Sequence, residues 1–173
     1  FYVNVFVWTY NPKRPDRPAL PFITYDFQDW ALCEIESALL DQHDLFVKKS
    51  RDIGASWMIL AALNHAATFR RLQSFLCMSR VADLVDKRGD PKTLFWKMDF
   101  ILDHLPGWLR PEIDRKELHF GFSGTSSTVD GESTTGDAGR AARVTGLMLD
   151  EFASIEEGRR VFASTRDASD CRL

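Results

Sequence analysis

Apolar residues recur with a helical period in three parts of the chain. From Phe27 onward they return at spacings of three and four, which predicts an amphipathic helix. Residues 56–70 are largely apolar and rich in alanine and leucine, and they predict a second helix. Residues 94–105 predict a third helix, which ends near Pro106 and Gly107 because neither residue favours continuing it. We therefore expect three principal helices.

Short apolar runs bounded by polar residues predict the strands. Residues 45–49 (LFVKK) and Ser74–Ser79 (SFLCMS) predict two buried strands, and the alternating segment 116–131 predicts an antiparallel hairpin. The run in RVTGLMLDE, residues 143–151, predicts a further buried strand that ends in two acids. Because strands alternate with helices, the predicted fold class is α/β, with a mainly parallel, twisted sheet flanked by helices.

The beginning of the chain is rich in proline. Residues 11–21 hold four of the seven prolines, which exclude a regular helix and a central strand. We therefore expect an extended arm over residues 1–23 and one domain over residues 24–173. A chain of this length can bury roughly 70% of its unfolded surface, which is enough for one core. Residues 171–173 (CRL) resemble the start of a strand, so we expect the chain to be a piece of a longer protein.

Composition and charge exclude several classes of protein. The formal net charge of -3 gives no bulk attraction for nucleic acid, so a DNA partner would need a local basic surface or a further domain. Cys33, Cys77 and Cys171 lie far apart, which excludes a C-x-x-C metal motif and favours reduced thiols. No apolar run approaches the roughly 20 residues that cross a bilayer, and the apolar start lacks the features of a signal peptide.

Residues 46–60, FVKKSRDIGASWMIL, have the outline of a phosphate-binding loop between a strand and a helix. The pattern G-x-x-x-x-G-K-[ST] supplies backbone N–H groups, a lysine for the phosphates and a hydroxyl for Mg²⁺. Aligned on Gly54 and Ser56, the chain has Lys49 at the first glycine and Ala55 at the lysine. The candidate nucleotide-binding residues of the loop are Lys49, Ser50, Arg51, Asp52, Ile53, Gly54, Ala55, Ser56 and Trp57.

A lysine at the start of the loop can replace the missing one, because both ends of such a loop wrap the same phosphates. Lys49 is the first candidate, with Lys48 and Arg51 as alternatives, and Ser56 would bind Mg²⁺. Trp57 either packs the loop against the sheet or lies near the nucleotide. A different interpretation is that the basic residues are solvated charges on a turn and Ser56 is a helix N-cap. This segment alone favours that second interpretation.

The strand that ends in Asp150 and Glu151 supports the interpretation of the loop as a nucleotide-binding loop. A nucleotide hydrolase needs one carboxylate to hold Mg²⁺ and a second to polarise the attacking water. In a parallel sheet the carboxyl end of this strand lies at the edge where ligands bind, next to the loop. Alternatively, the two acids begin the next helix, where negative charge is favourable. The combination of loop and acids favours an ATP hydrolase with Ser56 and Asp150 as metal ligands and Glu151 as catalytic base.

Together these motifs resemble the N-terminal ATPase domain of the large terminase subunit, the DNA-packaging motor of tailed bacteriophages and prophages. Lys49 in KSRDIGAS stands where members of this family often carry a displaced Walker A lysine, and LMLDEFA is similar to their Walker B segment. In ITYDFQDWAL, Gln28 stands where the family's glutamine bonds the adenine. In GDAGRAAR, the resemblance implies that Arg140 or Arg143 reaches a γ-phosphate, in cis or from a neighbouring subunit.

The resemblance also implies a fold, cofactors and partners. It implies a P-loop NTPase fold of the additional-strand type, with ATP and Mg²⁺ as cofactors. Hydrolysis would drive double-stranded DNA into a procapsid through the portal protein, in a homo-oligomeric ring that works with the small terminase subunit. The location would be the host bacterial cytoplasm, with no membrane, and the isolated chain would be a monomer and a slow ATPase.

The resemblance leaves two parts of the family outside the chain. The coupling motif, a Ser/Thr-Thr step after the next strand, is not the AST at residues 163–165, which lies too near the acids and resembles a loop or helix. The nuclease domain would also follow residue 173, so we expect no nuclease activity. Two alternative functions remain open. One is another P-loop nucleic-acid motor of helicase type, and the other is a non-catalytic assembly module with a decayed loop.

Overall fold

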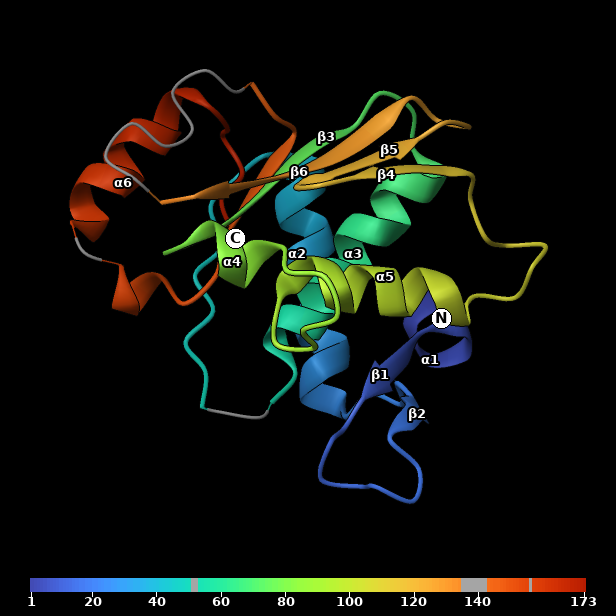
Figure 1. Ribbon diagram of the computed structural model, residues 1–173. Helices are drawn as coiled ribbons and strands as arrows, with labels where there is room; N and C mark the ends of the chain where they lie inside the picture. The colour runs from blue at the N-terminus through green and yellow to red at the C-terminus, as the bar shows by residue number, and fades with distance from the viewer. Residues whose placement is uncertain (51–52, 135–142, 156) are drawn as a thin grey trace.

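A five-stranded sheet forms the centre of the computed structural model, which describes residues 1–50, 53–134, 143–155 and 157–173. The strand order is β4-β5-β6-β3-β7 (Figure 1). β3 is parallel to both of its neighbours, β6 and β7, whereas β5 is antiparallel to both β4 and β6. The strands are β3 (Ser74–Ser79), β4 (Ile113–Lys116), β5 (His119–Phe122), β6 (Ser127–Ser133) and β7 (Gly146–Leu149).

This arrangement confirms an α/β fold and the predicted hairpin, but it corrects the prediction of a mainly parallel sheet. The sheet is mixed, because β4, β5 and β6 follow one another through the short connections 117–118 and 123–126. Connections of this length join antiparallel neighbours, whereas a parallel pair needs a crossover of about a dozen residues or more. The parallel pairs, β3 with β6 and β3 with β7, join strands that lie far apart in the sequence.

The other side of β7 is lined by the end of the chain. Leu147 and Arg172 form an isolated parallel bridge, and Leu173 N donates to Leu147 O at 2.8 Å. Leu45 N in turn donates to Arg172 O at 2.9 Å, so the chain before the candidate loop lies next to residues 171–173. The predicted strand over residues 45–49 does not form. Residues 46–50 are irregular and exposed, since an apolar run becomes a strand only where a neighbouring strand pairs with it.

Three long helices gather on one side of the sheet (Figure 1). They are α2 (Asp26–Asp41), α3 (Ala55–Phe69) and α5 (Leu94–His104), and each confirms a predicted helix. Side chains of β3 alternate between two clusters, as the period of a strand requires. Phe75 and Cys77 join the main core under the helices, whereas Leu76 and Met78 join a smaller cluster on the opposite face.

The first 23 residues are more structured than the proline pattern indicates. Helix α1 (Tyr2–Phe6) is followed by a hairpin of β1 (Trp8–Tyr10) and β2 (Ala19–Pro21), so the prediction of a wholly extended arm is corrected. The reason is tertiary packing. Three apolar side chains of this segment enter the main core, and they are Val3, Val7 and Phe22.

The remaining elements are short. They are α4 (Ala82–Val85), η1 (Phe152–Ser154), α6 (Gly158–Ser164) and η2 (Thr165–Asp167). Residues 163–165 thus lie at a helix end, as expected for a segment that precedes the next strand. Within the part of the chain that the structure describes, no helix has both the length and the apolar character needed to span a bilayer.

Candidate functional site

Ser56 and Asp150 meet although 94 residues separate them in the sequence. Ser56 lies in the first turn of α3, and its Oγ donates to Asp150 Oδ1 at 3.1 Å. Asp150 directly follows β7, and its backbone N donates to Met78 O at 2.9 Å, which fixes the end of the strand against β3. The structure therefore brings together a hydroxyl and a carboxylate at the carboxyl end of the parallel strands, where open α/β sheets bind ligands.

Gly54 allows the sharp turn that leads into α3. It is the N-cap of the helix, with a left-handed φ of +80°, a conformation that glycine adopts without a steric penalty. A Cβ at this position would lie 3.3 Å from Gln28 Nε2 and 3.7 Å from Phe22 Cζ. The position thus requires glycine for two reasons, the backbone conformation and the close approach of a side chain.

Gln28 fixes the loop from the side of α2. Its Nε2 donates to Ile53 O at 2.9 Å, and its Oε1 accepts from Tyr25 N at 3.0 Å. The side chain is only 5% exposed, so its amide bridges the start of α2 and the residue before Gly54. In the structure Gln28 positions the loop, and its predicted contact with an adenine base stays a prediction.

The predicted basic residues of the loop differ in their surroundings. Lys48, Lys49 and Ser50 are exposed, whereas Arg51 and Asp52 lie outside the described residues. Ala55, at the usual position of the lysine, is 4% exposed and belongs to the main core. Positive charge for a phosphate would therefore have to come from elsewhere than position 55.

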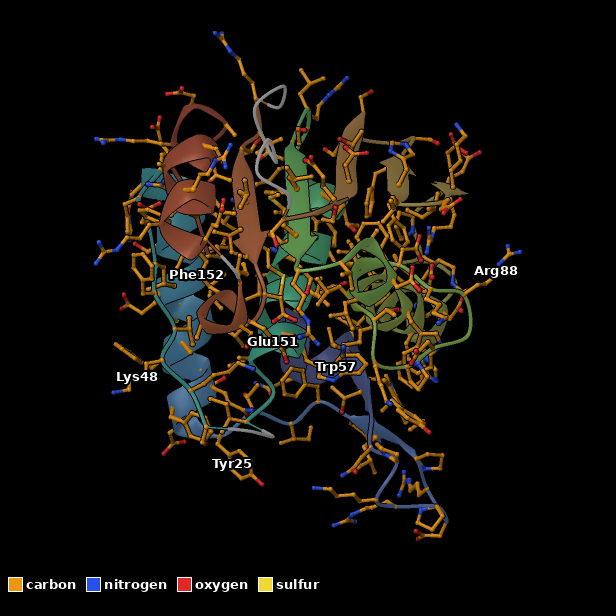
Figure 2. All side chains as sticks on the ribbon, turned by 60° about the vertical axis from the view of Figure 1, so that its left-hand side comes forward. Tyr25, Lys48, Trp57, Arg88, Glu151 and Phe152 are labelled. Atoms are coloured by element: carbon orange, nitrogen blue, oxygen red, sulfur yellow. The ribbon has the colours of Figure 1, made fainter. Side chains whose placement is uncertain are left out.

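Glu151 has an unusual backbone. Its φ of +51° and ψ of +38° are left-handed, a conformation that few residues other than glycine adopt and that often occurs at functional sites. Its side chain is exposed, and Figure 2 shows it just beyond the end of the strand that precedes it. The ring of Trp57 lies 5.8 Å from that of Phe100 in an edge contact, so it joins α3 to α5. Glu151 is thus presented to solvent beside the Ser56–Asp150 contact.

Lys97 is a residue of this region that the sequence did not indicate. Its Nζ donates to Lys92 O at 2.7 Å and to Thr93 O at 3.2 Å, at the start of α5. Burial lowers the pKa of Lys97, and the negative charge of Asp150 is the largest effect that opposes this change. A single lysine within an amphipathic helix carries no motif, so only the packing of α5 reveals its position.

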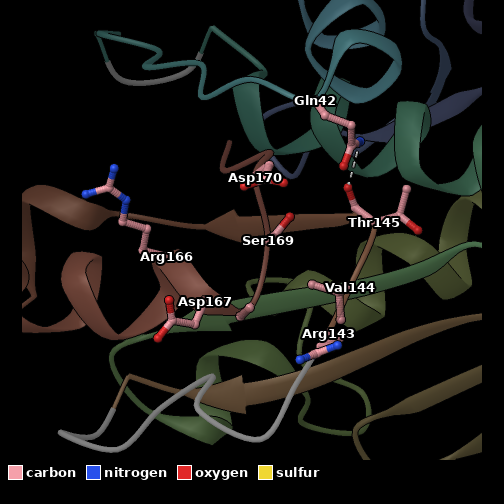
Figure 3. A pocket seen from close by; sticks show the side chains of 9 residues that line it. Gln42, Arg143, Val144, Thr145, Arg166, Asp167, Ser169 and Asp170 are labelled. Carbon is pink, nitrogen blue, oxygen red and sulfur yellow. Dashed lines mark hydrogen bonds between the residues drawn. The ribbon is translucent and has the colours of Figure 1, made fainter.

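Of the two predicted arginines, Arg140 lies outside the described residues and Arg143 does not join the other site residues. Arg143 lies before the start of β7, whereas Asp150 follows its end. The four residues of this strand alone span roughly 13 Å. Figure 3 shows Arg143 at a pocket of about 440 Å³ that Gln42 and Arg166 also line. The structure therefore gives Arg143 no position from which to reach the Ser56–Asp150 region of its own chain.

The donor set at this edge fits Mg²⁺ better than a transition metal. Mg²⁺ is usually held by one or two carboxylates together with waters and substrate phosphates, and Ser56 and Asp150 supply one carboxylate and one hydroxyl. Among the described residues no group of three or more histidine, cysteine, aspartate or glutamate side chains could hold a metal ion. The metal would therefore depend on the oxygens of a bound nucleotide.

No protein-family model matches the chain, and no curated protein matches it. The functional interpretation therefore depends on the motifs and on the geometry of the site.

Proposed function

We propose that the chain is a P-loop ATPase domain, and that it serves as the ATPase motor of a phage or prophage large terminase. The observation that carries the ATPase is the contact between Ser56 Oγ and Asp150 Oδ1. A hydroxyl in the first turn of a helix and a carboxylate at the end of a parallel strand are the protein groups that bind Mg²⁺ in P-loop NTPases. The two predicted metal ligands occupy such positions.

The arrangement of strands supports the additional-strand type. This type has a strand between the one that leads to the phosphate-binding loop and the one that ends in the acids. Here β7 leads to Asp150, and residues 171–173 lie beside it through the bridge to Leu147. Leu45, in the segment before the loop, bonds to Arg172 on the outer side. Residues 171–173 thus lie between the other two segments, which supports this type.

The residues of the site have distinct roles in the proposed mechanism. The N–H groups in the first turn of α3 and the Lys49 ammonium would bind the phosphates, and Ser56 and Asp150 would hold Mg²⁺. When bound, Mg²⁺ supplies positive charge to the β- and γ-phosphates. The Glu151 carboxylate would accept a proton from a water molecule whose oxygen bonds to the γ-phosphorus. The bond from that phosphorus to the β–γ bridging oxygen then breaks, and ADP leaves.

The motor function is proposed from the resemblance. Hydrolysis would translocate double-stranded DNA into a procapsid through the portal protein, with the small terminase subunit as a further partner. In a homo-oligomeric ring, Arg140 or Arg143 of one subunit would act on the ATP of its neighbour. This arrangement is consistent with Arg143 lying far from Asp150 in its own chain. An arginine supplied in trans contributes about 10³- to 10⁵-fold to the rate where it has been measured.

Calorimetric titration with Mg²⁺-ATP, together with an assay of phosphate release, tests the proposal. The wild-type chain is expected to bind, Lys49→Ala to lose binding, and Lys87→Ala, an exposed lysine outside the loop, to bind as the wild-type chain does. Glu151→Gln is expected to bind normally and to lose about 10²- to 10⁴-fold in hydrolysis, because it removes only the general base. Absence of binding by the wild-type chain would contradict the proposal and favour an assembly module with a decayed loop.

A further inference from the structure

The candidate site carries two adjacent carboxylates. Asp150 and Glu151 both lie at the end of β7, and a bound triphosphate would add further negative charge. The residue at position 55, which is lysine in the usual loop, is a buried alanine. Lys49 belongs to an exposed, irregular segment before the loop. A second cation, fixed near the carboxylates, would help to balance their charge.

Helix α5 brings a lysine to the candidate site. The ring contact of Trp57 with Phe100 places α5 against the start of α3, directly beside Ser56. Lys97 precedes Phe100 by three residues, which places both on the same face of the helix. Three of the charged groups that act on Lys97 belong to the candidate site, namely Asp150, Lys49 and Glu151, and the fourth is Asp90.

The ammonium of Lys97 is held in place by backbone carbonyls. Two of its three N–H groups donate to Lys92 O and Thr93 O, at 2.7 and 3.2 Å, and no other group of the described residues accepts from the third, which can therefore contact a ligand. The side chain is half-buried, so the ammonium is less hydrated than that of an exposed lysine. A fixed and partly dehydrated ammonium is well suited to bind an anion, because the side chain loses little conformational freedom and little bound water on binding.

We infer that Lys97 is a substrate-binding residue that contacts the γ-phosphate of ATP and supplies the positive charge that is missing at position 55, an inference that rests on the proposed function. Lys49 binds the phosphates from the loop, and Lys97 binds the terminal phosphate from the side of the acids. The ligand class is a nucleoside triphosphate, as distinct from a diphosphate. Lys97 thereby gives the site its means of distinguishing ATP from ADP.

Titration of two nucleotides tests this inference. Mg²⁺-ADP and the Mg²⁺ complex of a non-hydrolysable ATP analogue are titrated into the wild-type chain, Lys97→Met and Lys97→Arg. Lys97→Met keeps most of the stem and removes the charge, so it is expected to lose about 10- to 100-fold in affinity for the analogue and none for ADP. Lys97→Arg retains the charge and is expected to keep the preference for the analogue. Lys92→Ala, an exposed lysine of the same region, is the matched control.

The outcomes separate this inference from the proposed function. Unchanged affinity of Lys97→Met for the analogue would overturn the role of Lys97 and leave the ATPase proposal intact. An equal loss for ADP and for the analogue would also overturn it, because that pattern indicates a structural role. If the wild-type chain binds neither nucleotide, the proposed function fails and the inference fails with it. Circular dichroism of each variant verifies that the fold is retained.

Discussion

Replacing Gly54 by alanine would alter both the backbone and a side-chain contact of the candidate loop. Gly54 has a φ of +80°, and a left-handed conformation costs a residue with a Cβ about 1–2 kcal/mol. The new Cβ would lie 3.3 Å from Gln28 Nε2, which donates to Ile53 O. Gln28 would have to shift by a few tenths of an ångström, and a weakened hydrogen bond adds about 0.5–1.5 kcal/mol.

Gly89 provides a matched control within the same chain. Its φ is +78°, almost equal to that of Gly54, yet nothing lies within 4 Å of a Cβ built on it. Gly89→Ala therefore introduces the backbone strain without the contact, and we expect it to cost about 1 kcal/mol. For Gly54→Ala we expect a loss of about 2 kcal/mol in the free energy of unfolding. The difference between the two variants isolates the contact with Gln28.

Thermal denaturation followed by circular dichroism measures both variants. In a chain of this size 1 kcal/mol corresponds to about 2–4 °C in Tm, so the expected decreases are about 2–4 °C for Gly89→Ala and about 4–8 °C for Gly54→Ala. Titration with Mg²⁺-ATP should show weaker binding only for Gly54→Ala, because only that variant displaces the loop. Equal losses of stability, together with equal nucleotide affinity, would refute the reasoning.

Two further predictions concern the stability of the fold. Arg115 donates to Asp86 through both terminal nitrogens and to Asp99 through Nε, so Arg115→Met should cost about 2–3 kcal/mol in urea denaturation, because it removes the cation that pairs with the poorly exposed Asp86 carboxylate. His65 packs against the rings of Tyr2 and Phe69, and burial lowers its pKa. Its neutral form therefore contributes stability above the unfolded pKa of about 6.5, and this contribution should be lost as the pH falls through the lower folded pKa. His65→Phe should lack that pH dependence.

Each of these predictions has a control in the chain. Lys116 pairs with the exposed Asp114, so Lys116→Met should cost no more than about 0.5 kcal/mol. A cost for Arg115→Met as small as that would contradict the importance of its carboxylate partners. His43 is exposed, so His43→Gln should retain the wild-type loss of stability in acid. If His65→Phe retains it too, another group is responsible.

The elements that the sequence predicted correctly are those whose signal is local. The three- and four-residue periods of α2 and α5 reflect one buried face, and the run of α3 is apolar because this helix is buried on most sides. β3 and β7 are apolar because they are covered on both faces. The proximity of Ser56 and Asp150 agrees with the prediction that the loop and the acids meet at the carboxyl edge of the sheet, although the strand expected before the loop does not form.

The features that sequence reasoning missed depend on contacts between distant segments. The run at residues 45–49 has the composition of a strand, but apart from Leu45 it lies exposed and irregular. The prolines of the first segment exclude a long helix locally, but they do not reveal that Val3, Val7 and Phe22 complete the core. The position of Lys97 likewise arises from the packing of α5 on α3, which no short motif encodes.

The contact between Ser56 and Asp150 also explains how metal and nucleotide would depend on each other. The hydroxyl and the carboxylate are joined by a hydrogen bond of 3.1 Å. A metal ion that binds both oxygens has to break this bond, which is worth about 0.5–1.5 kcal/mol. One carboxylate and one hydroxyl are few ligands for an ion that prefers six oxygens and gives up its waters reluctantly. The β- and γ-phosphate oxygens of ATP would add the missing ligands. Mg²⁺ would therefore enter the site with the nucleotide, and Lys97 would contact the phosphate that ADP lacks.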